Sequence, residues 1–225
     1  MSARPASFVD VLADRRIVVV VRHHDDDVAE TIARAAAAGG ARAVEITTSV
    51  PGAAALIGRL RGSLAPGVLV GAGTVLSVVQ LDAVLAEGAQ FVVAPGLDRA
   101  IVERCVAAQV PVVPGALTPT EVTAGRALGL DALKLFPADS VGPAHLRALR
   151  SVFPDIAFVP TGGVRADNAA AWFAAGAHAL GLSGEFDAAH RAGGADAVRN
   201  LARRLSETFE TDAANRSMSR TPSQI

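Results

Sequence analysis

The sequence predicts an α/β fold, a (β/α)8 TIM barrel with an N-terminal helix. Short β-branched runs alternate with Ala-rich segments of helical length, and the pattern repeats about every 20 to 25 residues, as expected for a parallel sheet. The chain has 225 residues, which suits one compact barrel. An open doubly wound sheet would place a G-x-G-x-x-G motif after the first strand, where this chain has Arg22, His23, His24 and Asp25. The closed barrel is therefore favoured.

Eight strands are predicted, each followed by a helix. The strands are residues 17–22, 42–47, 68–71, 90–94, 110–114, 132–137, 156–160 and 177–183. The helices are residues 26–38, 53–64, 78–87, 99–108, 119–128, 143–152, 168–175 and 195–208, with a leading helix near 9–14. Residues 1–206 are expected to form one domain. The polar residues 207–225 are expected to form a disordered tail.

The composition excludes several classes of protein. The formal net charge is −1, which argues against a nucleic-acid partner. A single Cys excludes an intramolecular disulfide, and no apolar run approaches the roughly 20 residues of a membrane span. The N-terminus lacks the apolar core of a signal peptide, so a cytoplasmic location is expected. His23 and His24 precede three aspartates, but consecutive residues cannot all face one ion, and no metal site is predicted.

Two ionisable residues interrupt predicted strands instead of following them. Side chains alternate along a strand, so Glu45 lies on the face opposite its two apolar neighbours and shares its face with Ala43. In a barrel the apolar neighbours face the helices, and Glu45 therefore points inward. The same alternation points Lys134, the only lysine of the chain, and Ala132 inward. The sequence thus predicts an acid and an amine inside one barrel.

A buried ion pair and a reactive pair are the two interpretations of Glu45 and Lys134. Burying both ions is costly unless their geometry is excellent, which makes the pair a weak stabilising device. Burial instead lowers the pKa of a lysine, and the free amine is then a nucleophile near neutral pH. An amine that attacks a carbonyl forms a Schiff base, and this step needs a nearby acid or base. The reactive interpretation is favoured.

Glycine-rich segments follow the seventh and eighth predicted strands. They contain Thr161, Gly162 and Gly163 in the first segment and Gly181, Ser183 and Gly184 in the second. Barrels build phosphate sites at this pair of strands from backbone N–H groups and a helix N-terminus. Gly162, Gly163, Ser183 and Gly184 are therefore the predicted phosphate-binding residues.

Several stretches resemble the bacterial 2-keto-3-deoxy-6-phosphogluconate aldolase family, which overlaps 4-hydroxy-2-oxoglutarate aldolase. In order, they are V-R ending at Arg22, V-E-I-T around Glu45, V-G-A-G-T-V around Thr74, F-V-V-A-P-G ending at Gly96, P-G at Gly115, T-P-T-E ending at Glu121, L-K-L-F-P-A around Lys134 and V-P-T-G-G-V ending at Val164. Together they cover about residues 8 to 206. The resemblance implies a class I aldolase on a (β/α)8 barrel, a homotrimer, with a small 2-keto acid substrate and no metal or other cofactor.

The resemblance also implies roles for individual residues. Lys134 matches the lysine that forms the Schiff base, and Glu45 matches the residue that transfers protons. Thr74 matches a contact to the pyruvyl carboxylate, Arg22 an arginine facing the site, and Thr161 a position that influences stereochemistry. The predicted substrate site also includes Thr47, Ser49, Pro95 and Phe136.

The chain departs from the family at two places. Some members have an arginine where this chain has Ser49, so Arg22 is expected to take more of the carboxylate charge. The family commonly has Gly-Ser after the eighth strand, whereas this chain has Ser183, Gly184 and then Glu185. An inward Glu185 would repel a phosphate.

The implied reaction cleaves 2-keto-3-deoxy-6-phosphogluconate to pyruvate and glyceraldehyde 3-phosphate, and also 4-hydroxy-2-oxoglutarate to pyruvate and glyoxylate. Three alternatives stay open: an aldolase for an unphosphorylated 2-keto-3-deoxy acid, a phosphate-binding barrel isomerase, and a barrel that binds sugar acids without catalysis.

Overall fold

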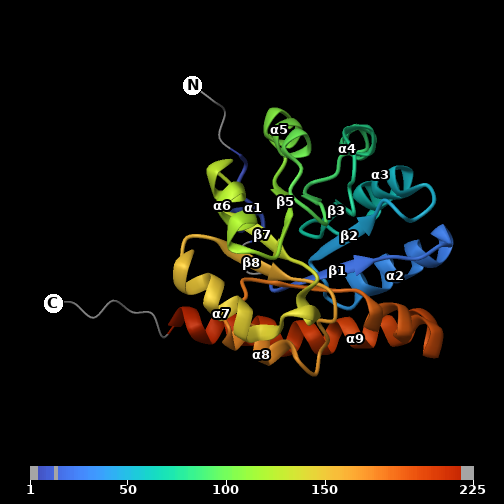
Figure 1. The fold of residues 1–225 in the computed structure, drawn as a ribbon. Helices are drawn as coiled ribbons and strands as arrows, with labels where there is room; N and C mark the ends of the chain where they lie inside the picture. The colour runs from blue at the N-terminus through green and yellow to red at the C-terminus, as the bar shows by residue number, and fades with distance from the viewer. Residues whose placement is uncertain (1–4, 13–14, 219–225) are drawn as a thin grey trace.

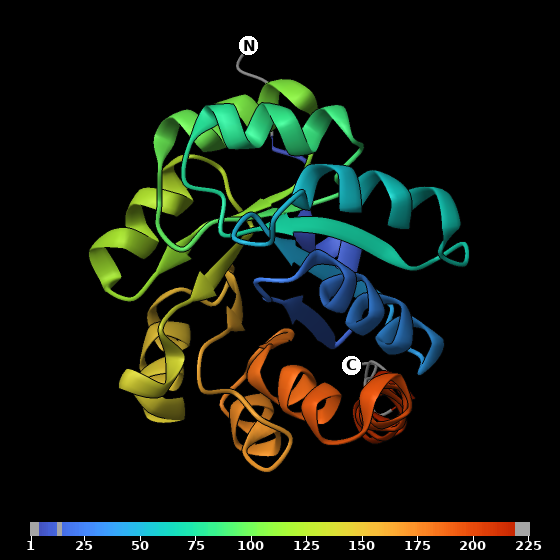
Figure 2. The same cartoon turned by 90° about the vertical axis from the view of Figure 1, so that its right-hand side faces the viewer.

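Parallel strands form the centre of the molecule and helices surround them (Figures 1 and 2). The structure is a computed structural model that describes residues 5–12 and 15–218. Its strands are β1 (Ile17–Val21), β2 (Ala43–Thr47), β3 (Leu69–Gly73), β4 (Val92–Val93), β5 (Val112–Val113), β6 (Gly115–Ala116), β7 (Ala132–Leu135), β8 (Ala157–Pro160) and β9 (Leu180–Leu182). The predicted (β/α)8 barrel is confirmed.

The strands close into a ring through two connections. One sheet has the order β5-β4-β3-β2-β1-β9, and a second has the order β6-β7-β8. β5 and β6 are consecutive along the chain on either side of Pro114, whose ring leaves no N–H for a ladder hydrogen bond. A bridge between Thr161 and Gly181 joins β8 to β9. The structure is thus a closed barrel of eight strands, in which β5 and β6 together make up one strand.

The helices surround this ring, except the first, which covers its N-terminal end. They are α1 (Phe8–Leu12), α2 (Asp26–Ala38), α3 (Ala53–Ser63), α4 (Val78–Ala86), α5 (Arg99–Ala108), α6 (Pro119–Ala127), η1 (Ala138–Ser140), α7 (Gly142–Val152), α8 (Ala169–Ala174) and α9 (Gly184–Met218). Thr118 and Glu121 form a capping box at α6, and Asp25 caps α2. Among the described residues no helix is both long and apolar enough to cross a membrane.

Alternation along the strands separates two apolar layers. Val18 and Val20 belong to a cluster inside the barrel that also contains Ala43 and Ala132. Val19 and Val21 belong to the larger cluster between strands and helices. The predicted inward faces of the second and sixth barrel strands are therefore confirmed.

α1 covers the N-terminal end of the barrel. Phe8 and Leu12 are buried in the inner cluster, and the Phe8 ring meets Phe91 edge to face at 5.8 Å. The Asp131 carboxylate, which precedes β7, accepts hydrogen bonds from the Phe8 N–H at 3.3 Å and from the Ser7 hydroxyl. This end of the barrel is closed by side chains, so the opposite end is the one open to a ligand.

α9 differs from the prediction at both ends. It begins at Gly184 and is bent at Gly193 and Gly194, where the backbone angles are not helical. It continues to Met218, where a disordered tail starting at residue 207 was expected, and residues 219–225 lie outside the described part. Phe209 is buried and packs on Phe173 at 5.2 Å, which explains why the helix continues.

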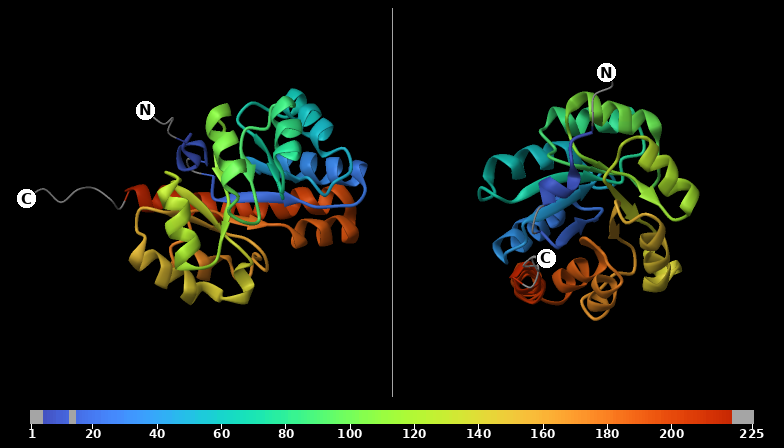
Figure 3. Two further views of the ribbon diagram at one scale, coloured as in Figure 1. Left: turned by 45° about the horizontal axis from the view of Figure 1, so that its top comes forward. Right: turned by 90° about the vertical axis from the view of Figure 1, so that its left-hand side faces the viewer.

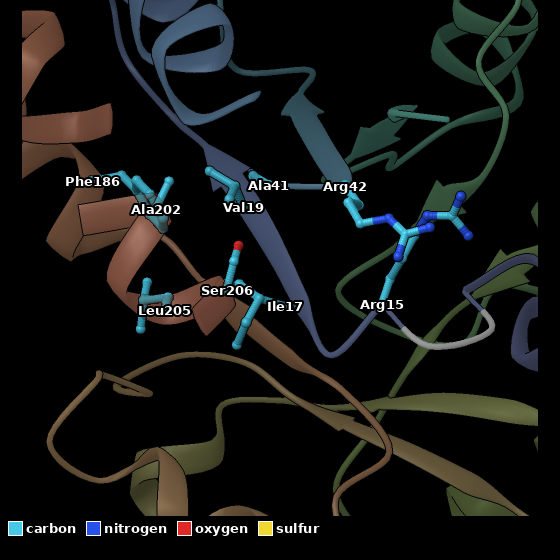
Figure 4. Close-up of a pocket in the computed structure, with 9 residues that line it drawn as sticks. All are labelled: Arg15, Ile17, Val19, Ala41, Arg42, Phe186, Ala202, Leu205 and Ser206. Carbon is cyan, nitrogen blue, oxygen red and sulfur yellow. The ribbon is translucent and has the colours of Figure 1, made fainter. Parts of the chain in front are cut away.

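α9 lies beside α2 and the outer face of β1 (Figure 3). A small pocket remains between them and is lined by Arg15, Ile17, Val19, Ala41, Arg42, Phe186, Ala202, Leu205 and Ser206 (Figure 4). Ile17 and Val19 are on the outward face of β1, so this pocket is separate from the barrel interior. Arg15 donates to the carbonyl oxygens of Leu12 and Gly67.

Candidate active site

Glu45 and Lys134 lie inside the barrel on β2 and β7. Glu45 is 2% exposed and Lys134 is 4% exposed. Oε1 of Glu45 is buried without a hydrogen-bond partner among the described residues. Nζ of Lys134 lies 4.8 Å from the centre of the Phe136 ring. A buried acceptor and a buried amine thus lie on strands of the same barrel, and an aromatic ring lies near the amine.

Burial shifts the pKa values of this pair in opposite directions. Desolvation raises the pKa of Glu45, although the positive charges of Lys134 and Arg22 act against this shift. Desolvation also lowers the pKa of Lys134, which Arg22 lowers further and the Glu45 carboxylate opposes. Each group is therefore shifted toward its neutral form, which is the nucleophilic form of the amine.

Arg22 and Thr74 form a polar corner at the open end of the barrel. Arg22 Nη2 donates to Thr74 Oγ1 at 2.9 Å, and Thr48 Oγ1 donates to the Thr74 carbonyl oxygen at 2.6 Å. Thr74 has a φ of 56°, which is unusual for a β-branched residue. Such strain persists only where the surroundings hold it, and here two hydrogen bonds do so. The Arg22 guanidinium and the Thr74 hydroxyl can both donate hydrogen bonds to a carboxylate bound here.

The other predicted substrate residues lie around the same opening. Thr47 Oγ1 donates to the carbonyl oxygen of Val21, and its oxygen is 2.9 Å from that of Ser49. Pro95 is half-buried, and its carbonyl oxygen packs so closely on Gly115 that a Cβ there would lie 2.0 Å away. Gly115 pairs with Lys134 in the β6–β7 register. This glycine therefore allows the Pro95 backbone to approach the strand that pairs with the lysine.

The predicted phosphate-binding segments also meet. Thr161 is buried, and a Cβ on Gly181 would lie 2.4 Å from its Oγ1. Gly162 and Gly163 have φ values of 90° and 69°, which favour glycine. Ser183 is half-buried at the end of β9. The structure thus brings the two glycine-rich segments together, as expected from neighbouring strands.

Comparisons with known proteins agree with this arrangement. The model of the family "KDPG and KHG aldolase" matches residues 9–201. The chain belongs to this family. It is 37% identical over 152 residues to 2-dehydro-3-deoxy-6-phosphogalactonate aldolase of Escherichia coli, covering 67% of this chain and 73% of that protein. It is 40% identical over 134 residues to 2-dehydro-3-deoxy-phosphogluconate aldolase of Treponema pallidum, covering 59% and 63%.

Solved structures of aldolases are similar along nearly their whole length. The 2-keto-3-deoxy-6-phosphogluconate aldolase of Zymomonas mobilis has a TM-score of 0.79 at 32% identity, with 90% of this chain and 97% of that one covered. The aldolase of Legionella pneumophila, with pyruvate captured as a covalent carbinolamine, has a TM-score of 0.76 at 27% identity, with 87% and 96% covered. The predicted family and its class I aldolase chemistry are thus confirmed.

Gly73 lies directly against the Glu45 carboxylate, although it is not among the predicted site residues. A Cβ on Gly73 would lie 1.8 Å from Oε1 of Glu45. The Glu45 carboxylate therefore occupies the space that any larger residue would fill. The signal in the sequence is a glycine at the end of β3, the strand that pairs with β2; the predicted third strand stopped at Gly71, two residues too early.

Glu185 lies outside the predicted site but contacts one of its loops. Gly184 begins α9 instead of a loop, so Glu185 is in the first turn of that helix. Glu185 Oε2 accepts a hydrogen bond from the Ala166 N–H at 2.8 Å. Glu185 stands out in the sequence as a departure from the family, but its hydrogen-bond partner, which is 19 positions away in the preceding loop, was not predicted.

The histidines and Asp25 after β1 make local contacts with their neighbours. The Asp25 side chain accepts hydrogen bonds from the N–H groups of Asp27 and Val28. His23 stacks on His24 at 4.5 Å. In the part of the chain that the structure describes, no three His, Cys, Asp or Glu side chains are grouped to hold a metal ion.

Proposed function

We propose that this aldolase cleaves a 2-keto-3-deoxy sugar acid to pyruvate and an aldehyde through a Schiff base on Lys134. One observation carries the proposal. The only lysine of the chain is buried inside the barrel, where burial lowers its pKa and Glu45 is also buried. A buried amine of this kind is a nucleophile suited to a carbonyl substrate.

The first half of the proposed reaction forms an iminium ion. The neutral Lys134 amine attacks the C2 carbonyl carbon, and the carbinolamine loses water. Arg22 and Thr74 hold the C1 carboxylate at their polar corner, which orients C2 toward the amine. The iminium then acts as the electron sink for bond cleavage.

The second half breaks the C3–C4 bond. Glu45, directly or through a water molecule, removes the proton of the C4 hydroxyl, and C4 becomes the aldehyde carbonyl. The bonding electrons move to the iminium and give an enamine of pyruvate. Protonation at C3 and hydrolysis of the imine release pyruvate and regenerate Lys134.

The names of the relatives supply the candidate substrates. Those proteins are named for 2-dehydro-3-deoxy-phosphogluconate and 2-dehydro-3-deoxy-6-phosphogalactonate, or for both KHG and KDPG. The proposed products from the six-carbon skeleton of 2-keto-3-deoxy-6-phosphogluconate are pyruvate and a three-carbon aldehyde, which is glyceraldehyde 3-phosphate when the substrate is phosphorylated. With 4-hydroxy-2-oxoglutarate the aldehyde is glyoxylate.

Borohydride trapping tests this function. Pyruvate plus borohydride should add a stable mass to the peptide that contains Lys134. Lys134→Arg should give no adduct and no turnover, because a guanidinium stays protonated and is a poor nucleophile. An isomerase that uses Glu45 as base and Lys134 as a clamp would give no adduct and would exchange protons on a phosphorylated ligand. Folded wild-type protein without an adduct would exclude the Schiff base.

We also propose that the enzyme is a homotrimer and needs no metal. The trimer is what the resemblance to the aldolase family implies, and Leu76 and Val79, which are 61% and 80% exposed after β3, are candidate residues for the subunit contact. Light scattering tests the trimer, and full activity after dialysis against EDTA is expected. The cytoplasmic location stays a prediction.

A further inference from the structure

We infer that Thr48 is a positioning residue of this aldolase. Its hydroxyl holds the backbone of Thr74, and this backbone keeps the Thr74 side chain turned toward Arg22 at the corner proposed for the substrate carboxylate. The inference rests on the proposed function, because the carboxylate is that of the proposed 2-keto acid. Thr48 is not among the predicted substrate residues, and it acts on the corner through Thr74.

Thr48 and Thr74 leave two neighbouring strands side by side. β2 and β3 are parallel, and their register places Thr47 opposite Gly73, the last residue of each strand. The Thr48 N–H donates to the carbonyl oxygen of Gly73 at 2.8 Å, so the hydrogen bonding continues one step beyond the strands. This step brings the Thr48 hydroxyl to the next carbonyl oxygen, that of Thr74, to which it donates at 2.6 Å.

Thr74 has a backbone conformation that a β-branched residue seldom adopts. Its φ of 56° lies in the left-handed region, where the side chain is crowded by its own backbone. Among the described residues, Gln109 is the only other non-glycine residue with a positive φ, and it ends α5, which is a common place for this conformation. Thr74 ends no helix, so contacts with other segments must hold its conformation.

The peptide group after Thr74 is held from two sides. Its carbonyl oxygen accepts the Thr48 hydroxyl from the end of β2, and its N–H, which belongs to Val75, donates to the Val93 carbonyl oxygen of β4 at 3.3 Å. Since β3 lies between β2 and β4, these two bonds set the orientation of the planar peptide group. Loss of the Thr48 hydroxyl would free the carbonyl end, and the φ of Thr74 could then return to the favourable negative range.

The orientation of this peptide group decides where the Thr74 hydroxyl lies. A β-branched side chain has few allowed rotamers, so its oxygen moves with the backbone. In the structure that oxygen accepts a hydrogen bond from Arg22 Nη2 at 2.9 Å, and Arg22 follows β1 on the other side of β2. Relaxation of Thr74 would therefore separate the two groups that are proposed to hold the C1 carboxylate, and binding of that carboxylate would weaken.

Two substitutions of Thr48 test this role in pyruvate adduct formation with borohydride. Thr48→Val keeps the shape of the side chain and removes the hydroxyl; the pyruvate concentration for half-maximal adduct formation should rise at least about tenfold. Thr48→Ser keeps the hydroxyl and should restore a value within about threefold of wild type. Thr123→Val is the matched control, because the exposed Thr123 on α6 also donates its hydroxyl to a carbonyl oxygen, that of Pro119, at 2.9 Å. It should behave as wild type.

Acetone separates positioning of the carboxylate from a general role in the fold. It can form a Schiff base through its ketone but has no carboxylate, so the ratio of the adduct rate with pyruvate to that with acetone should fall at least about tenfold in Thr48→Val. An unchanged half-maximal pyruvate concentration in Thr48→Val, or an equal loss of rate with both ketones, would overturn the inference. Both results leave the proposed function intact, whereas wild-type protein that forms no adduct on Lys134 would refute the function itself.

Discussion

Burial inside the barrel shifts the pKa values of Lys134 and Glu45 in opposite directions. The same desolvation lowers the pKa of Lys134 below its ordinary 10.5 and raises that of Glu45 above its ordinary 4.5. Arg22, exposed at the barrel mouth, adds to the shift of the lysine and opposes the shift of the acid. We therefore expect Arg22 to influence the titration of the pair.

Replacing Arg22 should change the pH dependence of adduct formation. In Arg22→Gln the pKa of Lys134 rises, because a positive charge that disfavours the ammonium is lost. The rate at which the borohydride-trapped pyruvate adduct forms should fall at low pH, where Lys134 is protonated. This acid limb of the pH profile should therefore move to higher pH in Arg22→Gln. Arg59→Gln, on α3 and paired with Glu30, is the control and should leave the limb in place. A limb that does not move in Arg22→Gln would contradict this electrostatic role.

Replacing both Glu45 and Lys134 should abolish the reaction without destabilising the fold. Glu45→Gln combined with Lys134→Met should abolish turnover and leave the free energy of unfolding equal to wild type or about 1–4 kcal/mol higher, because no ions are then buried. Urea denaturation measures this. A loss of several kcal/mol in the double variant would show that the pair stabilises the barrel.

The pair also contributes to the pH dependence of stability. The folded state holds fewer protons on Lys134 just below pH 10.5, so this residue makes stability rise with pH in that window. The folded state holds more protons on Glu45 just above pH 4.5, so this residue makes stability fall as pH rises there. Both contributions should be absent from the double variant.

At the scale of elements, β2 and β3 approach so closely that only glycine fits beside Glu45. Gly73→Ala would place a methyl group on the carboxylate, and the Glu45 side chain would have to move. We expect kcat to fall by at least about tenfold, since small displacements of catalytic groups are costly. Gly62→Ala on α3 is the control; nothing lies within 4 Å of its Cβ, and it should gain about 0.5–1 kcal/mol of stability. Unchanged kcat in Gly73→Ala would refute the steric argument.

The last part of α9 is held by an aromatic contact. Phe209→Ala should lower the free energy of unfolding by about 3 kcal/mol, because a buried ring that packs on Phe173 is lost. Thr208→Ala, one position earlier and exposed, should change it by less than about 1 kcal/mol. Equal effects of the two substitutions would mean that the helix beyond residue 206 does not stabilise the barrel.

At the scale of the whole molecule, a ligand inside the barrel should stabilise every strand around it. Pyruvate at 100 times its dissociation constant should add about 2.7 kcal/mol to the free energy of unfolding. Calorimetry would show this as a higher Tm. Lys134→Arg should lose most of the gain, because its covalent step is absent. A full gain in Lys134→Arg would indicate binding without a Schiff base.

Much of the barrel could be predicted because both faces of its strands are buried. Alternation alone placed Ala43, Glu45, Ala132 and Lys134 on the inner face. Shifting either strand by one residue would turn the apolar side chains that pack against the helices into the barrel interior. Helix α2 was predicted with its observed ends, and its Asp25 cap explains why it starts where it does.

The parts that could not be predicted depend on contacts between distant segments. Glycine has low strand propensity, so the end of β3 at Gly73 was missed even though pairing with β2 keeps it extended. Gly193 and Gly194 interrupt the helical pattern, and the start of α9 before them was therefore missed. The partner of Glu185 is in another loop, and no local pattern encodes it.

The single lysine gives this enzyme an unusual spectroscopic property. Protein grown with ¹⁵N-lysine would carry the label at one residue, and its only labelled side-chain nitrogen would be the one inside the barrel. Ammonium, amine, imine and enamine nitrogens resonate in different ranges, so one signal would follow the state of this atom during turnover. The barrel thus contains its own site-specific NMR reporter, without any substitution.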